Sequence, residues 1–294
     1  MAACAATYGL TGTDFQSLGM EYGVPVMIIL ATRSLELSDT DVVLYAKLME
    51  QVRLQKAFPI KITSLVKNHE ESGKVTFPSR QREKTISQKR RYTAMVSSNF
   101  CTAKELLKFD GFKGGVFFLS SENKIWGYHQ EANKNKGIPI DFCEVVGADV
   151  PESDGSDTSQ STIMFDIADV KYMTNYGFVD TVDRQVLDID GITPVTMVKT
   201  TGATNTTTHA FVSVYSDCGE GCGLPTEGLT IDCFSGDGLP TAVSAIAGSP
   251  GDYDVTGTFA DADTSELTII PYKVGMTYTG LPYKTVTPLA VVVL

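Results

Sequence analysis

The residues best suited to bind a metal are three cysteines near residue 220. Cys218 and Cys222 are separated by three residues, and Cys233 follows eleven residues later. Thiolates at such spacings occur in zinc sites, and His209 could supply the fourth ligand of a tetrahedral centre. One C-x3-C pair is a weak signature, and six cysteines in 294 residues are too few for a disulfide scaffold. We therefore expect buried or loop thiols and no metal or other cofactor, and zinc stays open as the alternative.

No set of residues matches the pattern of a catalytic site. The three histidines are His69, His129 and His209. They form no helical H-x-x-x-H pair and have no serine or cysteine motif beside them, so we expect surface histidines. The glycine-rich run 111–115 does not match the phosphate-binding consensus G-x-x-x-x-G-K-[ST] and is typical of a turn. The acidic runs 154–157 and 188–191 lack the closing Glu of a calcium loop and are typical of solvated turns. The sequence does not predict an enzyme.

The charges are divided unevenly along the chain. The net charge is -11, with 24 Lys and Arg residues against 35 Asp and Glu residues. Residues 1–150 hold 19 basic and 16 acidic residues, whereas residues 151–294 hold 5 and 19. Strong acidity argues against sequence-independent binding to nucleic acid, because neutralising phosphates supplies most of that affinity.

One short segment is strongly basic in spite of this average. Seven basic residues fall within eighteen positions that contain one acidic residue, Glu83. They are Lys74, Arg80, Arg82, Lys84, Lys89, Arg90 and Arg91. One interpretation is a solvated loop or strand edge. The other is an inter-subunit contact surface that docks on an acidic neighbour, such as the acidic half of another copy of the chain.

The first part of the chain has the pattern of strands wrapped around two helices, which is typical of α+β proteins. A β-branched run at 24–30 predicts a buried strand, and the capping box Ser38 to Asp41 predicts a helix over 39–56. The polar stretch 69–88 predicts an extended loop or a projecting hairpin. Further strands are expected at 60–65, 91–98, 115–119, 124–128, 138–146 and 162–167, with a short helix after residue 102.

The last part of the chain has a pattern of short strands only. The Thr-rich stretch 200–208 is polar like an inter-domain linker, so we place one domain at 1–199 and a second at 209–294. Tyr253 resembles the tyrosine of an immunoglobulin corner, whose hydroxyl bonds to the backbone. Strands are expected at 210–215, 228–234, 241–245, 253–259, 266–271 and 289–294. So many strands without a helix describe an immunoglobulin-like β-sandwich.

The order of features in the first 200 residues resembles tail tube proteins of bacteriophages, in particular of phages that infect Bacteroidetes-like hosts. The features are a capped helix ending in an aromatic-Pro segment at 46–59 and a long charged loop at 68–90. A short helix with Leu-Leu-x-Phe follows at 106–109, and a hairpin with an aromatic residue and Gly at 116–127. An appended C-terminal immunoglobulin-like domain is a common decoration of phage tail and capsid proteins.

The resemblance implies both fold and function. The expected fold class is mainly β (α+β), with a tail-tube-like β-barrel or sandwich domain that has one or two helices, followed by an immunoglobulin-like β-sandwich. The expected function is a structural protein of the virion tail, a tail tube subunit that self-assembles into stacked hexameric rings and forms the channel for genome delivery. Its expected partners are further copies of the chain, other virion tail proteins and passing genomic DNA, which it would not bind sequence-specifically.

The expected location is the virion, after assembly in the cytoplasm of the host bacterium. No membrane insertion is expected, because the longest apolar run, 24–31, is far shorter than the roughly 20 residues that cross a bilayer. A second function is open: an immunoglobulin-like decoration or binding protein of a capsid or tail that holds host glycans, suggested by Tyr272, Tyr278 and Tyr283. A neck position and an enzyme whose site is assembled from distant residues are further alternatives.

Overall fold

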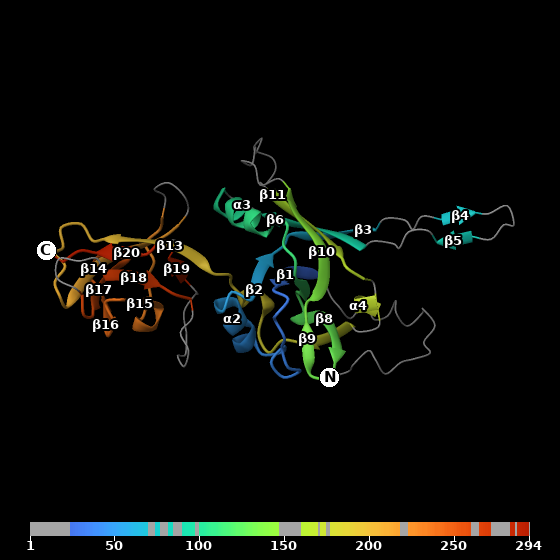
Figure 1. Cartoon of the computed structure of the whole chain (residues 1–294), viewed down its shortest axis with the longest axis horizontal. Coiled ribbons are helices and arrows are strands. Elements are labelled where there is room, and N and C mark those ends of the chain that lie inside the picture. The colour runs from blue at the N-terminus through green and yellow to red at the C-terminus, as the bar shows by residue number, and fades with distance from the viewer. Residues whose placement is uncertain are drawn as a thin grey trace. The chain divides into compact units, whose positions relative to one another are not determined.

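The computed structural model describes residues 24–69, 74–76, 82–84, 90–97, 100–146, 160–169, 171–174, 177–217, 223–259, 265–271, 283–285 and 287–293. These residues are mainly β, with several sheets (Figure 1). The chain divides into two compact units, Met1–Ile189 and Asp190–Leu294. Within the described ranges, none of the helices combines the length and the apolar character needed to cross a membrane.

The first unit is built mostly from strands. In chain order they are β1 (Pro25–Ala31), β2 (Ala57–Lys61), β3 (Ser64–His69), β4 (Lys74–Thr76), β5 (Arg82–Lys84), β6 (Arg90–Ser97), β7 (Gly115–Ser120), β8 (Lys124–Glu131), β9 (Lys134–Lys136), β10 (Ile138–Val146), β11 (Gln160–Ile167) and β12 (Gly177–Thr181). The α-helices are α2 (Tyr45–Arg53), α3 (Phe100–Leu106) and α4 (Lys171–Thr174). The expected hairpin of 115–119 with 124–128 is confirmed as β7 and β8.

The strand pairings of the first unit close into a ring. β1 lies between β2 and β7, β10 pairs first with β7 and then with β11, and β6 lies between β11 and β3. Only Ile62 and Thr63 separate β2 from β3, and their amides donate to the carbonyls of Val26 in β1 and Met95 in β6. Backbone hydrogen bonding therefore passes from β1 to β6 without a gap. In this ring β2 and β3 each pair with one strand, β1 and β6, and the ring closes through the short connection at Ile62 and Thr63.

The interior of this ring is a packed core. Residues Met27 to Ala31 of β1 are buried on both faces of the strand, and Ile28 and Leu30 belong to this core. The ring of Tyr92 is stacked on that of Phe165 with centroids 5.7 Å apart, and Phe118 lies 6.1 Å from Phe165. Trp126 in turn stacks on Phe118, with ring centroids 5.4 Å apart. Among the described residues, aromatic rings thus fill the space between the two halves of the ring of strands.

Two glycines let β7 and β10 approach each other where they meet. A Cβ atom on Gly115 would lie 2.4 Å from the carbonyl oxygen of Gly137, which comes directly before β10. Farther along, β10 has a register shift between Ile140 and Phe142. Such a bulge bends a strand, so β10 can leave β7 and continue along β11.

The second unit has two sheets around one core. The larger sheet has the order β16 (Ala242–Ala245), β17 (Asp252–Thr256), β14 (His209–Ser216), β13 (Thr193–Lys199) and β19 (Tyr283–Thr285). The smaller sheet has the order β15 (Phe234–Gly236), β18 (Ser265–Ile269) and β20 (Leu289–Val291). β13 and β19 are parallel, and the other pairs are antiparallel. Val212 and Tyr253 of the larger sheet pack in the same cluster as Phe234 and Ile269 of the smaller one.

The predicted linker 200–208 is wrong, because this segment lies inside the second unit. It joins β13 to β14, which are adjacent antiparallel strands. The amide of Thr200 donates to the carbonyl of Phe211 at 3.0 Å, and that of Thr206 to His209 at 2.8 Å. The segment is a hairpin loop, and β13, which we expected to end the first domain, is the first strand of the second unit. A polar, Thr-rich composition suits an exposed hairpin loop as well as a linker.

The strand predicted at 228–234 is also wrong. The chain forms a single 3-10 turn at Ile231–Cys233, and strand β15 begins only at Phe234. The reason is a contact with Tyr253, whose hydroxyl donates to the carbonyl of Thr226 at 2.8 Å and accepts from the amide of Leu229 at 3.2 Å. The expected bond from this tyrosine to the backbone is confirmed. Its partners, however, lie 27 and 24 residues upstream, instead of a few.

Candidate functional site

The structure divides the basic segment among three strands. Lys74 lies in β4, Arg82 and Lys84 in β5, and Arg90 and Arg91 in β6, whereas Arg80 and Lys89 lie outside the described residues. β4 and β5 form a two-stranded sheet of their own, which agrees with the predicted hairpin (Figure 1). Its register sets Lys74 opposite Lys84.

Arg91 is bound within its own chain. Its Nε and Nη2 atoms donate to the two carboxylate oxygens of Asp166, at 2.8 and 3.0 Å. Asp166 stands opposite Arg91 in the pairing of β6 with β11, and its side chain is 5% exposed. A bidentate pair of this kind is strong and geometrically specific. Arg91 therefore joins two strands of the ring, and its predicted contact with another subunit stays a prediction.

Arg90 also has partners within the first unit. Its Nη1 atom lies 3.9 Å from the sulfur of Met173, and its side chain hydrogen-bonds to Tyr92. Burial raises the pKa of the Tyr92 phenol, and the neighbouring guanidinium opposes that rise. The contact of Lys74, Arg80, Arg82, Lys84, Lys89 and Arg90 with another subunit likewise stays a prediction.

The described residues do not bring a zinc site together. Cys218 and Cys222 lie outside them, and the half-buried Cys233 has its sulfur 3.8 Å from the hydroxyl of Thr230. His209 points its Nδ1 atom at Asp254 instead of at a cysteine. In the ranges that the structure covers, no three His, Cys, Asp or Glu side chains are grouped closely enough to hold an ion.

His129, which we expected at the surface, is partly buried. It lies in β8 with its ring 6.0 Å from that of Phe178, and its Nδ1 atom is buried without a partner among the described residues. Asn135 stands opposite it in β9 and is fully buried. The Nδ2 atom of Asn135 donates to Asp39 at 2.8 Å, but its Oδ1 atom has no described partner either.

The larger sheet of the second unit carries aromatic and polar side chains on one side. Side chains alternate between the two faces of a strand, and Val212 and Val214 of β14 point into the core. His209, Phe211 and Tyr215 therefore lie on the opposite face. The same rule applies to β17, in which Tyr253 and Val255 are buried. We call the outer face the set His209, Phe211, Tyr215, Asp252, Asp254 and Thr256.

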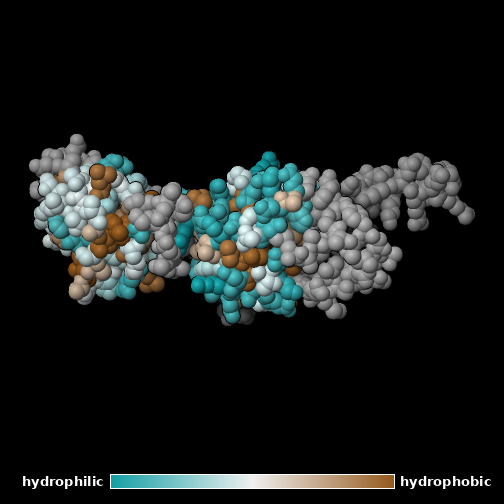
Figure 2. Space-filling model, turned by 90° about the horizontal axis from the view of Figure 1, so that it is seen from below, coloured by the Kyte–Doolittle hydropathy of each residue, from teal (hydrophilic) through white to brown (hydrophobic). Residues whose placement is uncertain are grey.

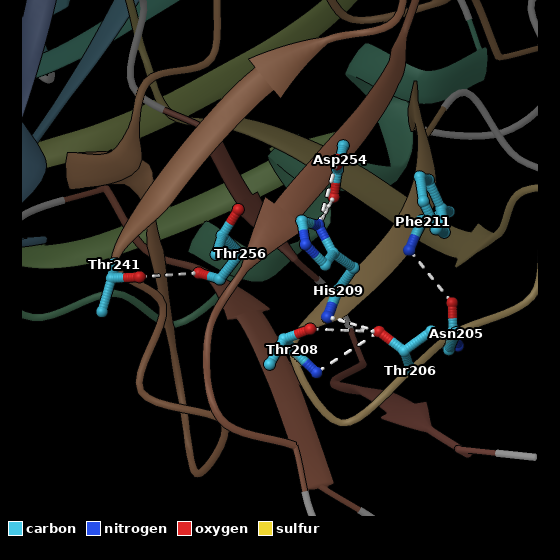
Figure 3. A network of polar contacts seen from close by, with 8 residues as sticks. All are labelled: Asn205, Thr206, Thr208, His209, Phe211, Thr241, Asp254 and Thr256. Carbon is cyan, nitrogen blue, oxygen red and sulfur yellow. Dashed lines mark hydrogen bonds and ion pairs between the residues drawn. The ribbon is translucent and has the colours of Figure 1, made fainter.

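A network of hydrogen bonds fixes one end of the outer face (Figure 3). The Nδ1 atom of His209 lies 2.9 and 3.2 Å from the two carboxylate oxygens of Asp254. The rings of His209 and Phe211 are nearly parallel, at 16°, with centroids 6.3 Å apart. The side chain of Thr206 accepts from the amide of His209 at 3.0 Å, and Asn205 accepts from the amide of Phe211 at 3.0 Å. Asp254 thus holds the His209 ring, and the loop 205–206 holds the backbone of His209 and Phe211.

Phe211 and Tyr215 were not among the predicted functional residues. Their signal is the alternation in the sequence 209–216, where aliphatic residues alternate with aromatic or polar ones. Of the aromatic residues that suggested glycan binding, Tyr272 and Tyr278 lie outside the described residues. Tyr283 is half-buried and packs against the core of the second unit, so it does not offer an exposed ring.

Comparison with protein-family models, with curated proteins and with solved structures finds no match to this chain. No relative therefore supplies a function. The function has to follow from the ring of strands in the first unit, the basic hairpin and the outer face of the second unit.

Proposed function

We propose that the chain is a virion structural protein, a tail tube subunit that assembles into stacked hexameric rings around a channel for genome delivery. The observation that carries the proposal is the closed ring of strands in the first unit, which supports a tail-tube-like barrel. Because the interior of that ring is filled, the channel would lie between subunits and not within one. DNA would pass it without sequence-specific contacts.

Contacts between subunits would come from strands outside the ring. β12 pairs with β8 on one side, and its other edge has no partner among the described residues. An exposed edge offers unpaired backbone groups to a strand of a neighbouring molecule. The β4 and β5 hairpin adds positive charge, which suits the acidic residues 151–294 of another copy.

The second unit would decorate the tail as an immunoglobulin-like domain. Its strand orders support this assignment. With the strands lettered A to G in chain order and the short β19 left out, the larger sheet has the order D-E-B-A and the smaller one C-F-G. Constant-type immunoglobulin domains pair their strands in this way. A decorating domain is not needed for assembly, so a chain that ends at Ile189 should still form rings.

Electron microscopy of the purified protein tests the proposal. We expect rings or tubes in negative stain, and we expect Arg80→Glu, Arg82→Glu and Lys84→Glu together to disturb them without changing the circular dichroism of the subunit. Assembly should also weaken as salt rises, because the Debye length falls from about 10 Å at 0.1 M to about 3 Å at 1 M. Reversal of three exposed lysines elsewhere, Lys104, Lys113 and Lys199, is the matched control.

Two results would contradict the proposal. A protein that stays monomeric at high concentration, with its neighbouring virion proteins present, would exclude the tube. A triple variant that assembles like the parent at every salt concentration would make the hairpin a solvated surface feature. A decoration protein that holds host glycans is the second candidate function, and the outer face of the second unit favours it.

A further inference from the structure

Strand β14 presents rings at three of its outward positions. His209, Phe211 and Tyr215 span six residue steps, or about 20 Å at roughly 3.4 Å per residue in an antiparallel strand. The side chain of His209 is 42% exposed, and Phe211 and Tyr215 are also partly accessible. Aromatic rings supply a large contact area at a small cost in conformational entropy. Such a row suits a ligand that is long and has flat apolar faces.

Polar groups accompany two of these rings. Thr256 of β17 stands opposite His209, and Asp254 stands opposite Phe211. On the other side of β17, Ser244 stands opposite Asp254. Hydroxyl groups both donate and accept hydrogen bonds, and a carboxylate accepts several. A ligand on the rings would therefore meet donors and acceptors along its sides.

The charge of the outer face restricts the ligand further. Asp252 and Asp254 are its charged groups, and no Lys or Arg stands at an outward position of the described strands β14, β16 and β17. A polyphosphate chain or an anionic lipid surface would be repelled. The core of a protein interface is depleted of charged residues, so the two carboxylates disfavour a protein partner on this face.

In Figure 2 the surface of the second unit is mostly pale, of middling hydropathy, whereas that of the first unit is mostly teal.

The His209 ring and the backbone of Phe211 are held before any ligand arrives. Asp254 binds one edge of the His209 ring, and Asn205 binds the amide of Phe211. Asn205 is 3% exposed and is itself anchored, because its Nδ2 atom donates to the carbonyl of Val292 at 3.3 Å. Groups fixed in this way lose little freedom on binding, which favours affinity.

We propose that the outer face of the second unit binds an uncharged oligosaccharide. A sugar ring has a face of C–H groups that packs on an aromatic ring and a rim of hydroxyl groups that bond to Asp, Thr and Ser side chains. Phe211 and Tyr215 are the stacking residues, and Asp254 and Thr256 bind the hydroxyl rim. The inference deepens the second candidate function and does not depend on tube assembly.

Isothermal titration of the full chain with neutral hexaoses tests this site, with maltohexaose, cellohexaose and mannohexaose as probes and an array of uncharged bacterial surface glycans for breadth. An acidic hexamer of galacturonic acid is the matched anionic probe. We expect binding of at least one neutral glycan and none of the acidic one. Phe211→Ala should weaken binding at least about tenfold, which equals 1.4 kcal/mol. Phe142→Ala is the control, since Phe142 is 43% exposed in β10 of the first unit.

Each outcome decides the matter. Failure of the parent chain to bind any neutral glycan, or equal affinity of Phe211→Ala and the parent, overturns the proposal. If Phe211→Ala does not fold, Tyr215→Ala at the far end of the row gives the same test. If the protein still assembles into hexameric rings in the electron microscope but does not bind glycans, only the proposal for the outer face is overturned. If it binds glycans but does not assemble, only the tail tube proposal is overturned.

Discussion

Replacing Tyr253 by Phe should destabilise the second unit and leave the first unit unchanged. The side chain is 2% exposed, and its hydroxyl pairs with the carbonyl of Thr226 and the amide of Leu229, which also lie in buried residues. Phe keeps the ring but leaves both backbone groups unpaired and away from water. Loss of a partner costs about 1 to 3 kcal/mol for a buried polar group, so we expect about 2 to 3 kcal/mol for the pair. A domain of about 100 residues then unfolds roughly 10 °C lower or more.

Differential scanning calorimetry and fluorescence together assign the effect to a unit. Trp126 is the one tryptophan of the chain and lies in β8, so its fluorescence reports on the first unit. The calorimetric transition of the second unit should move while the fluorescence transition stays in place. Tyr215→Phe, in the same sheet but on the outer face, is the control. Equal stability of the two variants would refute the role assigned to the Tyr253 hydroxyl, and so would a shift of the fluorescence transition.

Three further changes test other parts of the structure. Arg91→Leu removes the partner of the buried Asp166 carboxylate. It should lower the free energy of unfolding of the first unit by about 2 to 3 kcal/mol, less than for a fully buried pair, because Arg91 is only partly buried. An unchanged urea midpoint would contradict this. Gly115→Ala places a Cβ against the carbonyl of Gly137 and should cost at least about 2 kcal/mol in the same assay. An unchanged urea midpoint would contradict the close approach of β7 and β10 at this point. Burial raises the pKa of the Cys143 thiol from 9.0 to about 11, so the folded chain should resist alkylation at Cys143 at pH 8. Because the folded state favours the neutral thiol, the contribution of Cys143 to stability should be lost as the pH rises from 9.0 through about 11. Rapid alkylation of Cys143 in the native protein, detected by mass spectrometry, would show that it is exposed.

Local sequence patterns predict most strands of the first unit but not the exact start of its first described helix. The hydrogen bond of the predicted capping box forms, because the amide of Asp41 donates to the side chain of Ser38 at 3.0 Å. The helix nevertheless begins at Tyr45, whose amide donates to a carboxylate oxygen of Asp183 at 2.7 Å. Asp183 lies 138 residues away in the sequence. A cap supplied by tertiary structure leaves no trace in the spacing of nearby residues.

Pairing between distant strands is the other feature that the sequence does not reveal. The strand expected at 138–146 has the bounds of β10, but nothing in its alternation says that it pairs with β7 at one end and β11 at the other. The bulge after Ile140 depends on both partners. The outer face is partly visible in the sequence, because residues 209–216 alternate. The alternation does not show which side of the strand is exposed, and the core contacts of Val212 and Val214 establish that.

The order in which the ring strands leave the ribosome has a consequence for biosynthesis. β11, which ends at Ile167, is the last ring strand in chain order, yet it lies between β6 and β10. Until it emerges, each of those two strands has an unpaired edge. Nascent chains on the same messenger RNA would then hold open edges close together, a condition that favours strand exchange and aggregation. A chain made in many copies would therefore depend on rapid elongation from 97 to 167, and slow codons in that stretch should lower the yield of folded protein.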